Sequence, residues 1–235
     1  MEYSKIDKLN VNPSLLGFGC MRFPKKEDGT IDEVEAERML DYAIESGVTY
    51  IDTAYPYHDG ESEPFVGRVL KKYKREDFYL ATKLPMFKID SLEQAKEIFE
   101  EQMKRLDVDY VDFYLLHALN KDTWKKVIDL NIISYCEELK KQGRIKNFGF
   151  SFHDDYEVFE EIINYRDWDF CQIQLNYIDT DIQAGMKGYK LTEEKNVPLV
   201  IMEPIKGGAL ASLSDDIEQV FTYYNPNVSI SSWAL

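Results

Sequence analysis

The chain has 235 residues, 44% of them hydrophobic, which is enough for one substantial core and typical of a single α/β domain spanning residues 1–235. Lys and Arg number 28 against 43 Asp and Glu, so the formal charge is −15, which disfavours nucleic acids and anionic membranes as partners. No secretory signal opens the sequence, and no apolar run reaches the roughly 18–20 residues of a membrane span, so we expect a cytoplasmic protein.

Three cysteines, Cys20, Cys136 and Cys171, are scattered along the chain. Their number is odd and no CxxC pair exists, which disfavours a disulfide framework, a structural zinc site or an iron–sulfur cluster. We therefore expect buried free thiols.

Strand-like apolar runs alternate with helix-like segments from the first residues to the last. The expected strands are 15–20, 49–54, 78–83, 110–117, 145–152, 170–177 and 198–203. The expected helices are 32–46, 63–73, one from Ser91, a long one that ends at Gly143, 156–164, 182–195 and 214–224, and 228–235 resembles a helix start. About seven strand–helix units in this order predict parallel strands in a barrel or a doubly wound sheet.

Four residues suited to proton transfer come at or just after three consecutive expected strands: Asp52, Tyr57, Lys83 and His117. In an α/β barrel the carboxyl ends of the strands form the active face. A tyrosine has an ordinary pKa near ~10, and a neighbouring lysine ammonium would lower it. We therefore interpret Asp52 as holding Lys83, Lys83 as tuning Tyr57, and His117 as orienting a substrate carbonyl. Taken singly, each residue could instead be a buried ion pair, a packing ring or a core histidine.

These residues also carry a resemblance. Asp52-Thr53-Ala54-x-x-Tyr57, Lys83 at a strand end and Leu115-Leu116-His117 resemble the aldo-keto reductase family over essentially the whole chain. The resemblance implies a TIM-type (β/α)₈ barrel and an oxidoreductase that transfers hydride from a nicotinamide cofactor, NADP or NAD with NADP favoured, to an aldehyde or ketone. It also implies that Tyr57 is the general acid, tuned by Lys83 and Asp52, and that His117 helps to bind the carbonyl.

The resemblance also assigns residues to the cofactor. Gly149-Phe150-Ser151 resembles the family's Gly-x-Ser-Asn, with Phe152 in place of the asparagine, and Gln172-x-Gln174-x-Asn176 resembles its Gln-x-Glu-x-Asn element. Met202 stands where the family usually has an aromatic residue against the nicotinamide, and Lys206 would offset the charge of Glu203 near the pyrophosphate. The implied cofactor-binding residues are Gly19, Cys20, Met21, Asp52, Ser151, Gln172, Met202, Pro204, Lys206 and Gly207.

No eighth strand follows the seventh, so we expect a barrel that is incomplete at its C-terminus, with self-association through the open edge. The sequence resembles a branch of the family in which a ferredoxin-like iron–sulfur domain often follows the barrel. The cysteines of that domain are absent from this sequence. A second hypothesis is a catalytically weak barrel that binds a cofactor or a protein partner as a regulatory subunit. A metal-dependent hydrolase fits poorly, because no His/Asp cluster gathers at strand ends, and we expect no metal site.

Overall fold

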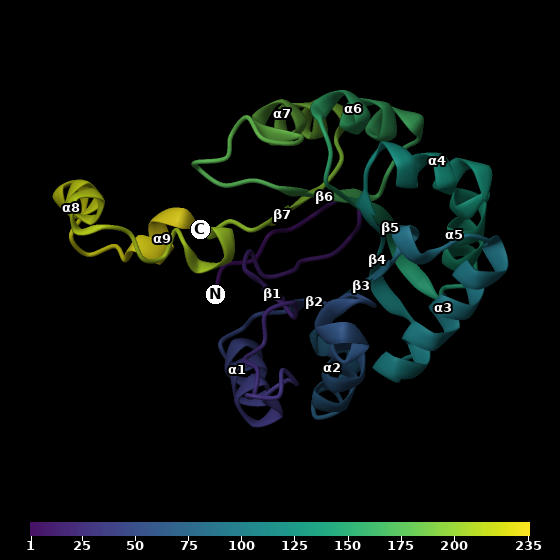
Figure 1. Ribbon diagram of the computed structural model, residues 1–235, viewed down its shortest axis with the longest axis horizontal. Coiled ribbons are helices and arrows are strands. Elements are labelled where there is room, and N and C mark those ends of the chain that lie inside the picture. Colours follow the sequence, from purple (N-terminus) through teal and green to yellow (C-terminus); the bar gives the residue numbers. More distant parts are fainter. The chain divides into compact units, whose positions relative to one another are not determined.

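The computed structural model describes residues 1–235, and the chain divides into two compact units (Figure 1). The first unit comprises residues 1–151 and 168–170, and the second comprises 152–167 and 171–235. We describe each unit by itself.

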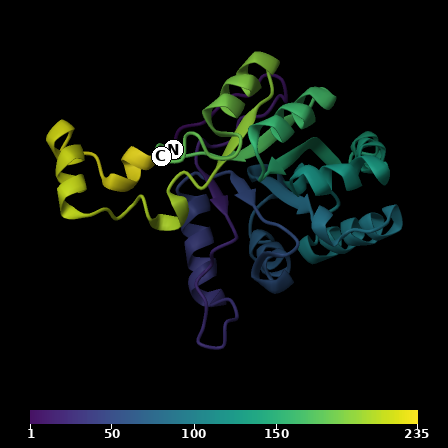
Figure 2. The ribbon, with the colours of Figure 1, turned by 45° about the horizontal axis from the view of Figure 1, so that its top comes forward.

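The first unit contains parallel strands in chain order, with helices along their outer side (Figures 1 and 2). Gly17 lies opposite Tyr50 and Ala81 opposite Phe113, which fixes the register of neighbouring strands. The strands are β1 (Gly17–Gly19), β2 (Tyr50–Asp52), β3 (Tyr79–Leu84), β4 (Val111–Leu119) and β5 (Ile145–Phe152). The helices are α1 (Glu33–Glu45), α2 (Ser62–Leu70), α3 (Leu92–Leu106), α4 (Lys121–Asp129) and α5 (Ile132–Lys141).

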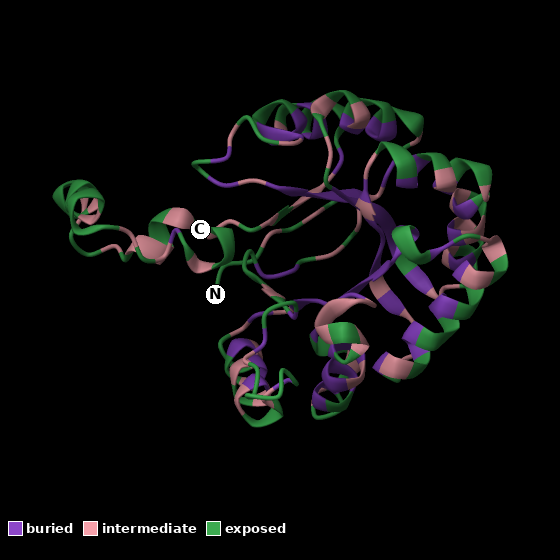
Figure 3. Ribbon diagram, in the orientation of Figure 1, coloured by how far each residue is buried: buried purple, intermediate pink, exposed green.

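Strands β2 to β5 consist mainly of buried residues, as parallel strands covered by helices require. All residues of β3 after Tyr79 are buried, including Thr82 and Lys83. Figure 3 shows the same pattern in the neighbouring strands and on the inner faces of the helices. Because the apolar pattern is nearly continuous, a charged residue such as Lys83 can be accommodated there only with buried partners.

Short polar signals fix the helix ends. The Ser91 side chain accepts a hydrogen bond from the Gln94 amide at the start of α3, as the sequence predicts. The long helix expected up to Gly143 is wrong: the chain forms α4 and α5, separated by Asn131 in the left-handed conformation, with φ of 56°. Asparagine tolerates the left-handed conformation, so the helix can be interrupted at Asn131 with little loss of stability. The apolar periodicity of the sequence continues across this position and gives no sign of the interruption.

The segment before β1 folds back on itself through backbone bridges that the sequence did not predict. Tyr3 bridges Ser14 and Ile6 bridges Val11 in antiparallel fashion, and the Lys8 Nζ donates to the Trp168 carbonyl at 2.9 Å. Three short 3₁₀ helices connect the larger elements: η1 (Tyr57–Gly60), η2 (Arg75–Asp77) and η3 (Met86–Lys88). The first of them carries the predicted proton donor.

The second unit contains two parallel strands and four helices. The strands are β6 (Phe170–Gln174) and β7 (Leu199–Met202), with Gln172 opposite Val200. The helices are α6 (Tyr156–Tyr165), α7 (Gly185–Lys195), α8 (Asp215–Tyr224) and α9 (Ile230–Ala234), and η4 (Lys206–Gly208) follows β7. Helices α6 and α7 pack side by side (Figure 2), and α8 has no buried residue (Figure 3).

Two expected boundaries in this unit are corrected. The strand expected up to residue 177 ends at Gln174, because the Asn176 side chain accepts hydrogen bonds from the amides of Ile178 and Asp179 and forms a turn. The helix expected from 182 begins at Gly185. None of the helices in either unit combines the length and the apolar character needed to cross a bilayer.

Candidate active site

In the first unit, the Lys83 side chain forms hydrogen bonds with two of the other predicted catalytic side chains, Asp52 and Tyr57. The Lys83 ammonium, at the end of β3, donates to the Asp52 carboxylate at the end of β2. It also donates to the Tyr57 hydroxyl at 3.2 Å and to the Thr53 carbonyl at 2.9 Å. The Lys83 side chain is only 1% exposed, so these groups hold a buried cation in one position.

The fourth side chain, His117, lies beside the phenol. The rings of His117 and Tyr57 are 5.8 Å apart, centroid to centroid, and meet edge to face. The exposed ring of Phe87, in η3, lies 5.7 Å from His117. The phenol and the imidazole are therefore neighbours, and a further aromatic ring lies beside the imidazole.

Burial and charge act in opposite directions on this cluster. Burial alone would lower the pKa of Lys83, but the charges of Asp52 and Tyr57 and the hydrogen bonds to both raise that pKa to about 12. Burial raises the pKa of Tyr57, whereas the charge and the hydrogen bond of Lys83 lower it, and burial prevails. The sequence predicted a net lowering, because sequence alone does not show how deeply the phenol is buried. The result is a charged lysine beside a phenol that keeps its proton.

The backbone that carries Tyr57 is held in an uncommon conformation. His58 and Asp59 have φ of 52° and 56°, and Gly60 has φ of 98°. The left-handed region is unfavourable for residues other than glycine, and such conformations persist where the surroundings fix them. One such contact is visible at His58, whose Nε2 accepts a hydrogen bond from the Phe23 amide at 3.1 Å.

Three candidate cofactor residues of the first unit, Gly19, Cys20 and Ser151, lie next to the same cluster. Cys20 is buried and its amide donates to the Asp52 carbonyl at 2.7 Å, while Met21 is half exposed. Burial raises the pKa of the Cys20 thiol well above its usual value. At Gly19 an added Cβ would meet nothing within 4 Å, so the backbone there faces open space. The Ser151 hydroxyl is buried and accepts from the Ala118 amide, next to His117, at 2.8 Å.

The remaining cofactor candidates belong to the second unit. Gln172 is buried in β6, and Met202 and Pro204 are half-buried at the end of β7 and just after it. Lys206 forms an ion pair with Asp179 at 2.8 Å, and Gly207 takes a left-handed conformation with φ of 65°. The amides of Gln174 and Asn176 also donate to Asp179, at 3.1 and 3.0 Å.

Asp179 was missed from the sequence. The structure shows that it anchors the loop after β7 through Lys206, so Lys206 has a carboxylate partner of its own besides any role near Glu203. The only sequence signal was the Asn-x-x-Asp spacing of Asn176 and Asp179, which is common in ordinary turns. The three buried free thiols, in contrast, are confirmed.

Comparison with known proteins identifies the class of protein. The model of the aldo/keto reductase family matches residues 15–229, and the chain belongs to this family of oxidoreductases. The structure of aldo-keto reductase AKR11C1 from Bacillus halodurans, in its holo form, superposes with a TM-score of 0.75 at 30% identity, over 92% of this chain and 71% of that one. This likeness confirms the predicted α/β barrel-type fold.

The curated relatives are similar at modest identity. A probable aldo-keto reductase 1 from Glycine max is 33% identical over 59% of this chain but 41% of its own length. The uncharacterized oxidoreductase YqkF of Bacillus subtilis is 29% identical over 89% of this chain and 67% of its own. The NADH-specific methylglyoxal reductase of Escherichia coli is 24% identical over 76% of this chain and 60% of its own. The chain thus spans between 41% and 67% of the length of these curated relatives.

Proposed function

We propose that this protein reduces a small aldehyde or ketone, with Tyr57 as the proton donor and NADPH or NADH as the reductant. The observation that carries the proposal is the buried chain of contacts from Asp52 through Lys83 to the Tyr57 hydroxyl. A lone buried lysine would avoid charge by losing its proton, but here its charge is retained beside a phenol. Such an arrangement is useful for stabilising a phenolate as it forms.

Each side chain has a distinct task in this proposal. Tyr57 gives its proton to the carbonyl oxygen as negative charge develops there. Lys83, held in place by Asp52 and the Thr53 carbonyl, stabilises the phenolate that remains. His117, edge to face with Tyr57, hydrogen bonds the carbonyl oxygen and orients it toward the phenol. The exposed ring of Phe87 next to His117 offers an apolar surface to the rest of the substrate.

A bound nicotinamide dinucleotide supplies the hydride. Each unit contains a buried hydrogen-bonding group whose chemistry suits a carboxamide: the Ser151 hydroxyl in the first unit and the Gln172 amide in the second. At Gly208, after β7, an added Cβ would meet nothing within 4 Å, so a phosphate could approach the backbone closely there. The family uses both phosphorylated and unphosphorylated nucleotides, and one relative is named as NADH-specific.

One departure from the family pattern weakens nucleotide binding in this proposal. Phe152 stands where the family usually has an asparagine, and its ring is fully buried against Phe159, 5.2 Å away in an edge-to-face contact. An aromatic ring packed in this way offers no hydrogen bond to a carboxamide. We therefore expect a dissociation constant for nucleotide that is higher than an asparagine at this position would give.

The test is a nucleotide-oxidation assay on the protein with a panel of aliphatic and aromatic aldehydes and ketones. NADPH and NADH are supplied separately, and nucleotide binding is measured in parallel by quenching of tryptophan fluorescence. Carbonyl-dependent oxidation with either nucleotide supports the proposal. Binding of nucleotide without any oxidation would instead favour the second hypothesis, a barrel that binds its cofactor and serves as a regulatory subunit.

A further inference from the structure

The buried carboxylate of Glu63, which has no part in the proposed reaction, is hydrogen-bonded to β3, the strand that carries Lys83. Glu63, in α2, is fully buried, and its Oε1 accepts hydrogen bonds from Thr82 at 2.6 Å and from the Gln102 amide at 2.8 Å. The same Gln102 amide donates to the Lys83 carbonyl at 2.9 Å, and the Tyr114 hydroxyl donates to the Gln102 carbonyl oxygen at 2.8 Å. A buried polar network of this kind holds its members in a single arrangement.

Arg105, in α3, connects this network to the loop that carries Tyr57. One guanidinium nitrogen, Nη1, lies 3.5 Å from the second carboxylate oxygen of Glu63. The same nitrogen donates to the carbonyls of Tyr55, at 3.5 Å, and Gly60, at 3.4 Å. These two carbonyls stand at the two ends of the segment 55–60, with Tyr57 between them.

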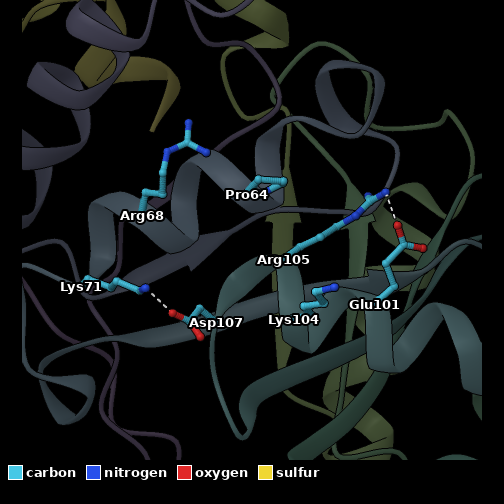
Figure 4. Close-up of a pocket in the computed structure, with 7 residues that line it drawn as sticks. All are labelled: Pro64, Arg68, Lys71, Glu101, Lys104, Arg105 and Asp107. Carbon is cyan, nitrogen blue, oxygen red and sulfur yellow. Dashed lines mark hydrogen bonds and ion pairs between the residues drawn. The ribbon is translucent and has the colours of Figure 1, made fainter.

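Other contacts of Arg105 fix its orientation. Its guanidinium lies over the Tyr55 ring, 4.2 Å from the centroid, and its Nη2 donates to Glu101 at 2.6 Å. The Tyr55 hydroxyl donates to the other oxygen of Glu101 at 2.8 Å. Figure 4 shows the pair of Arg105 and Glu101 at one side of a surface hollow of about 590 Å³, which is also lined by Pro64, Arg68, Lys71, Lys104 and Asp107.

Segment 55–60 has an uncommon backbone conformation, so contacts with its surroundings are required to keep it in place. His58, Asp59 and Gly60 are three consecutive residues with positive φ, a conformation that residues other than glycine adopt infrequently. A strained segment relaxes when the contacts that determine it are removed. Relaxation here would carry Tyr57 away from Lys83, to which it is bonded at 3.2 Å.

We propose that Arg105 is a positioning residue for Tyr57: it binds both ends of the strained segment 55–60, and the buried carboxylate of Glu63 holds Arg105 in place. This inference rests on the proposed function, since it assigns a structural cause to the position of the proton donor. It explains why a carboxylate is buried in α2 at a site that touches neither Tyr57 nor His117. A shift of about 1 Å at a reacting group can cost about 10²-fold in rate.

The experiment compares Arg105→Met with a matched control, Arg144→Met. Arg144 also binds a carboxylate and a backbone carbonyl, those of Glu100 and Asp109, and lies over the Phe99 ring, but it has no contact with segment 55–60. We expect Arg105→Met to lower kcat by about 10-fold to 10²-fold, with an unchanged dissociation constant for NADPH. Arg144→Met should keep kcat within about twofold of the wild type. Arg105→Lys, which keeps the charge and most of the side chain, should show a smaller loss in the same direction.

A second readout does not depend on turnover. With isotope-labelled tyrosine, the NMR resonance of Tyr57 is identified by its absence from Tyr57→Phe, and its pKa is followed by titration. Moving the phenol away from Lys83 changes both the charge beside it and its burial, which together set this pKa, so the pKa should differ from the wild-type value in Arg105→Met and not in Arg144→Met. An unchanged Tyr57 pKa and kcat in both Arg105 variants, or equal losses in Arg105→Met and Arg144→Met, would overturn the inference. A wild-type protein that reduces no carbonyl overturns the proposed function alone, and the titration still decides the role of Arg105.

Discussion

Replacing Lys83 by methionine tests the buried ion pair most severely. The side chain is 1% exposed, and that of its partner Asp52 is 12% exposed. Methionine has nearly the same length as the lysine stem, so the substitution removes the charge and its hydrogen bonds without leaving a large cavity. Taking one partner out of a buried ion pair typically costs about 3–5 kcal/mol, because the other charge stays in the interior without its counter-ion.

The pKa of Lys83 gives a second measure of the same interaction. The pKa in the folded chain is about 12, against 10.5 for an ordinary lysine, a difference of 12 − 10.5 = 1.5, which corresponds to about 2 kcal/mol. Because the pKa in the folded state is the higher one, this stabilisation is fully present below pH 10.5 and is lost as the pH rises through about 12. The loss of unfolding free energy expected for Lys83→Met exceeds this value, because the mutation also leaves the Asp52 carboxylate buried without its counter-ion.

The assay is urea denaturation at neutral pH followed by circular dichroism, with Lys72→Met as the control. Lys72 also pairs with two carboxylates, Glu37 and Asp41, but it is 41% exposed, so its loss should cost less than about 1 kcal/mol. Lys83→Met should lower the free energy of unfolding by about 3 kcal/mol or more, and the gap to the wild type should narrow above pH 10.5. A loss for Lys83→Met no larger than that for Lys72→Met would refute the reasoning.

Three further predictions follow from single features of the structure. Gly67→Ala should lower the free energy of unfolding by about 1–3 kcal/mol in the same assay, because the added Cβ would lie 2.7 Å from the carbonyl oxygens of Arg105 and Leu106. An unchanged urea midpoint would contradict the close packing of α2 on α3. Phe152→Ala should cost about 3 kcal/mol or more, since the ring is fully buried; a loss below about 1 kcal/mol would show that the ring is not part of a core. Carbonyl reduction should stay level from neutral pH up to about 10 and fall above it, because burial raises the pKa of Tyr57 above 10.0; a fall centred near neutral pH would assign the proton to another group.

Much of the fold could be predicted because apolar runs and helix caps are local signals. The strand expected at 78–83 is observed as β3, Tyr79–Leu84, and Ser91 caps α3 as expected. The break at Asn131 was missed because the apolar periodicity continues on both sides of it. The pairing of residues 1–16 was missed because its bridges are short and isolated.

The clustering of the four candidate site residues could be predicted because each stands near or just after the carboxyl end of a strand, and parallel strands bring such ends together. The contacts of Arg105 could not, because they join a side chain of α3 to the backbone of Tyr55 and Gly60, which lie 50 and 45 positions earlier in the sequence. The direction of the pKa shift of Tyr57 was missed for a similar reason. The direction depends on how deeply the surrounding chain buries the phenol, and a sequence motif does not indicate the depth of burial.

The most direct test of the central account is the rate of carbonyl reduction by Tyr57→Phe, measured beside the wild type in a single turnover with saturating nucleotide. The substitution keeps the ring and removes only the proton that the account assigns to the carbonyl oxygen. If Tyr57 donates the proton, this rate should fall by at least about 10²-fold, with the dissociation constant for nucleotide unchanged. A Tyr57→Phe protein that reduces the carbonyl at close to the wild-type rate would show that the chain from Asp52 through Lys83 to Tyr57 is not the proton source.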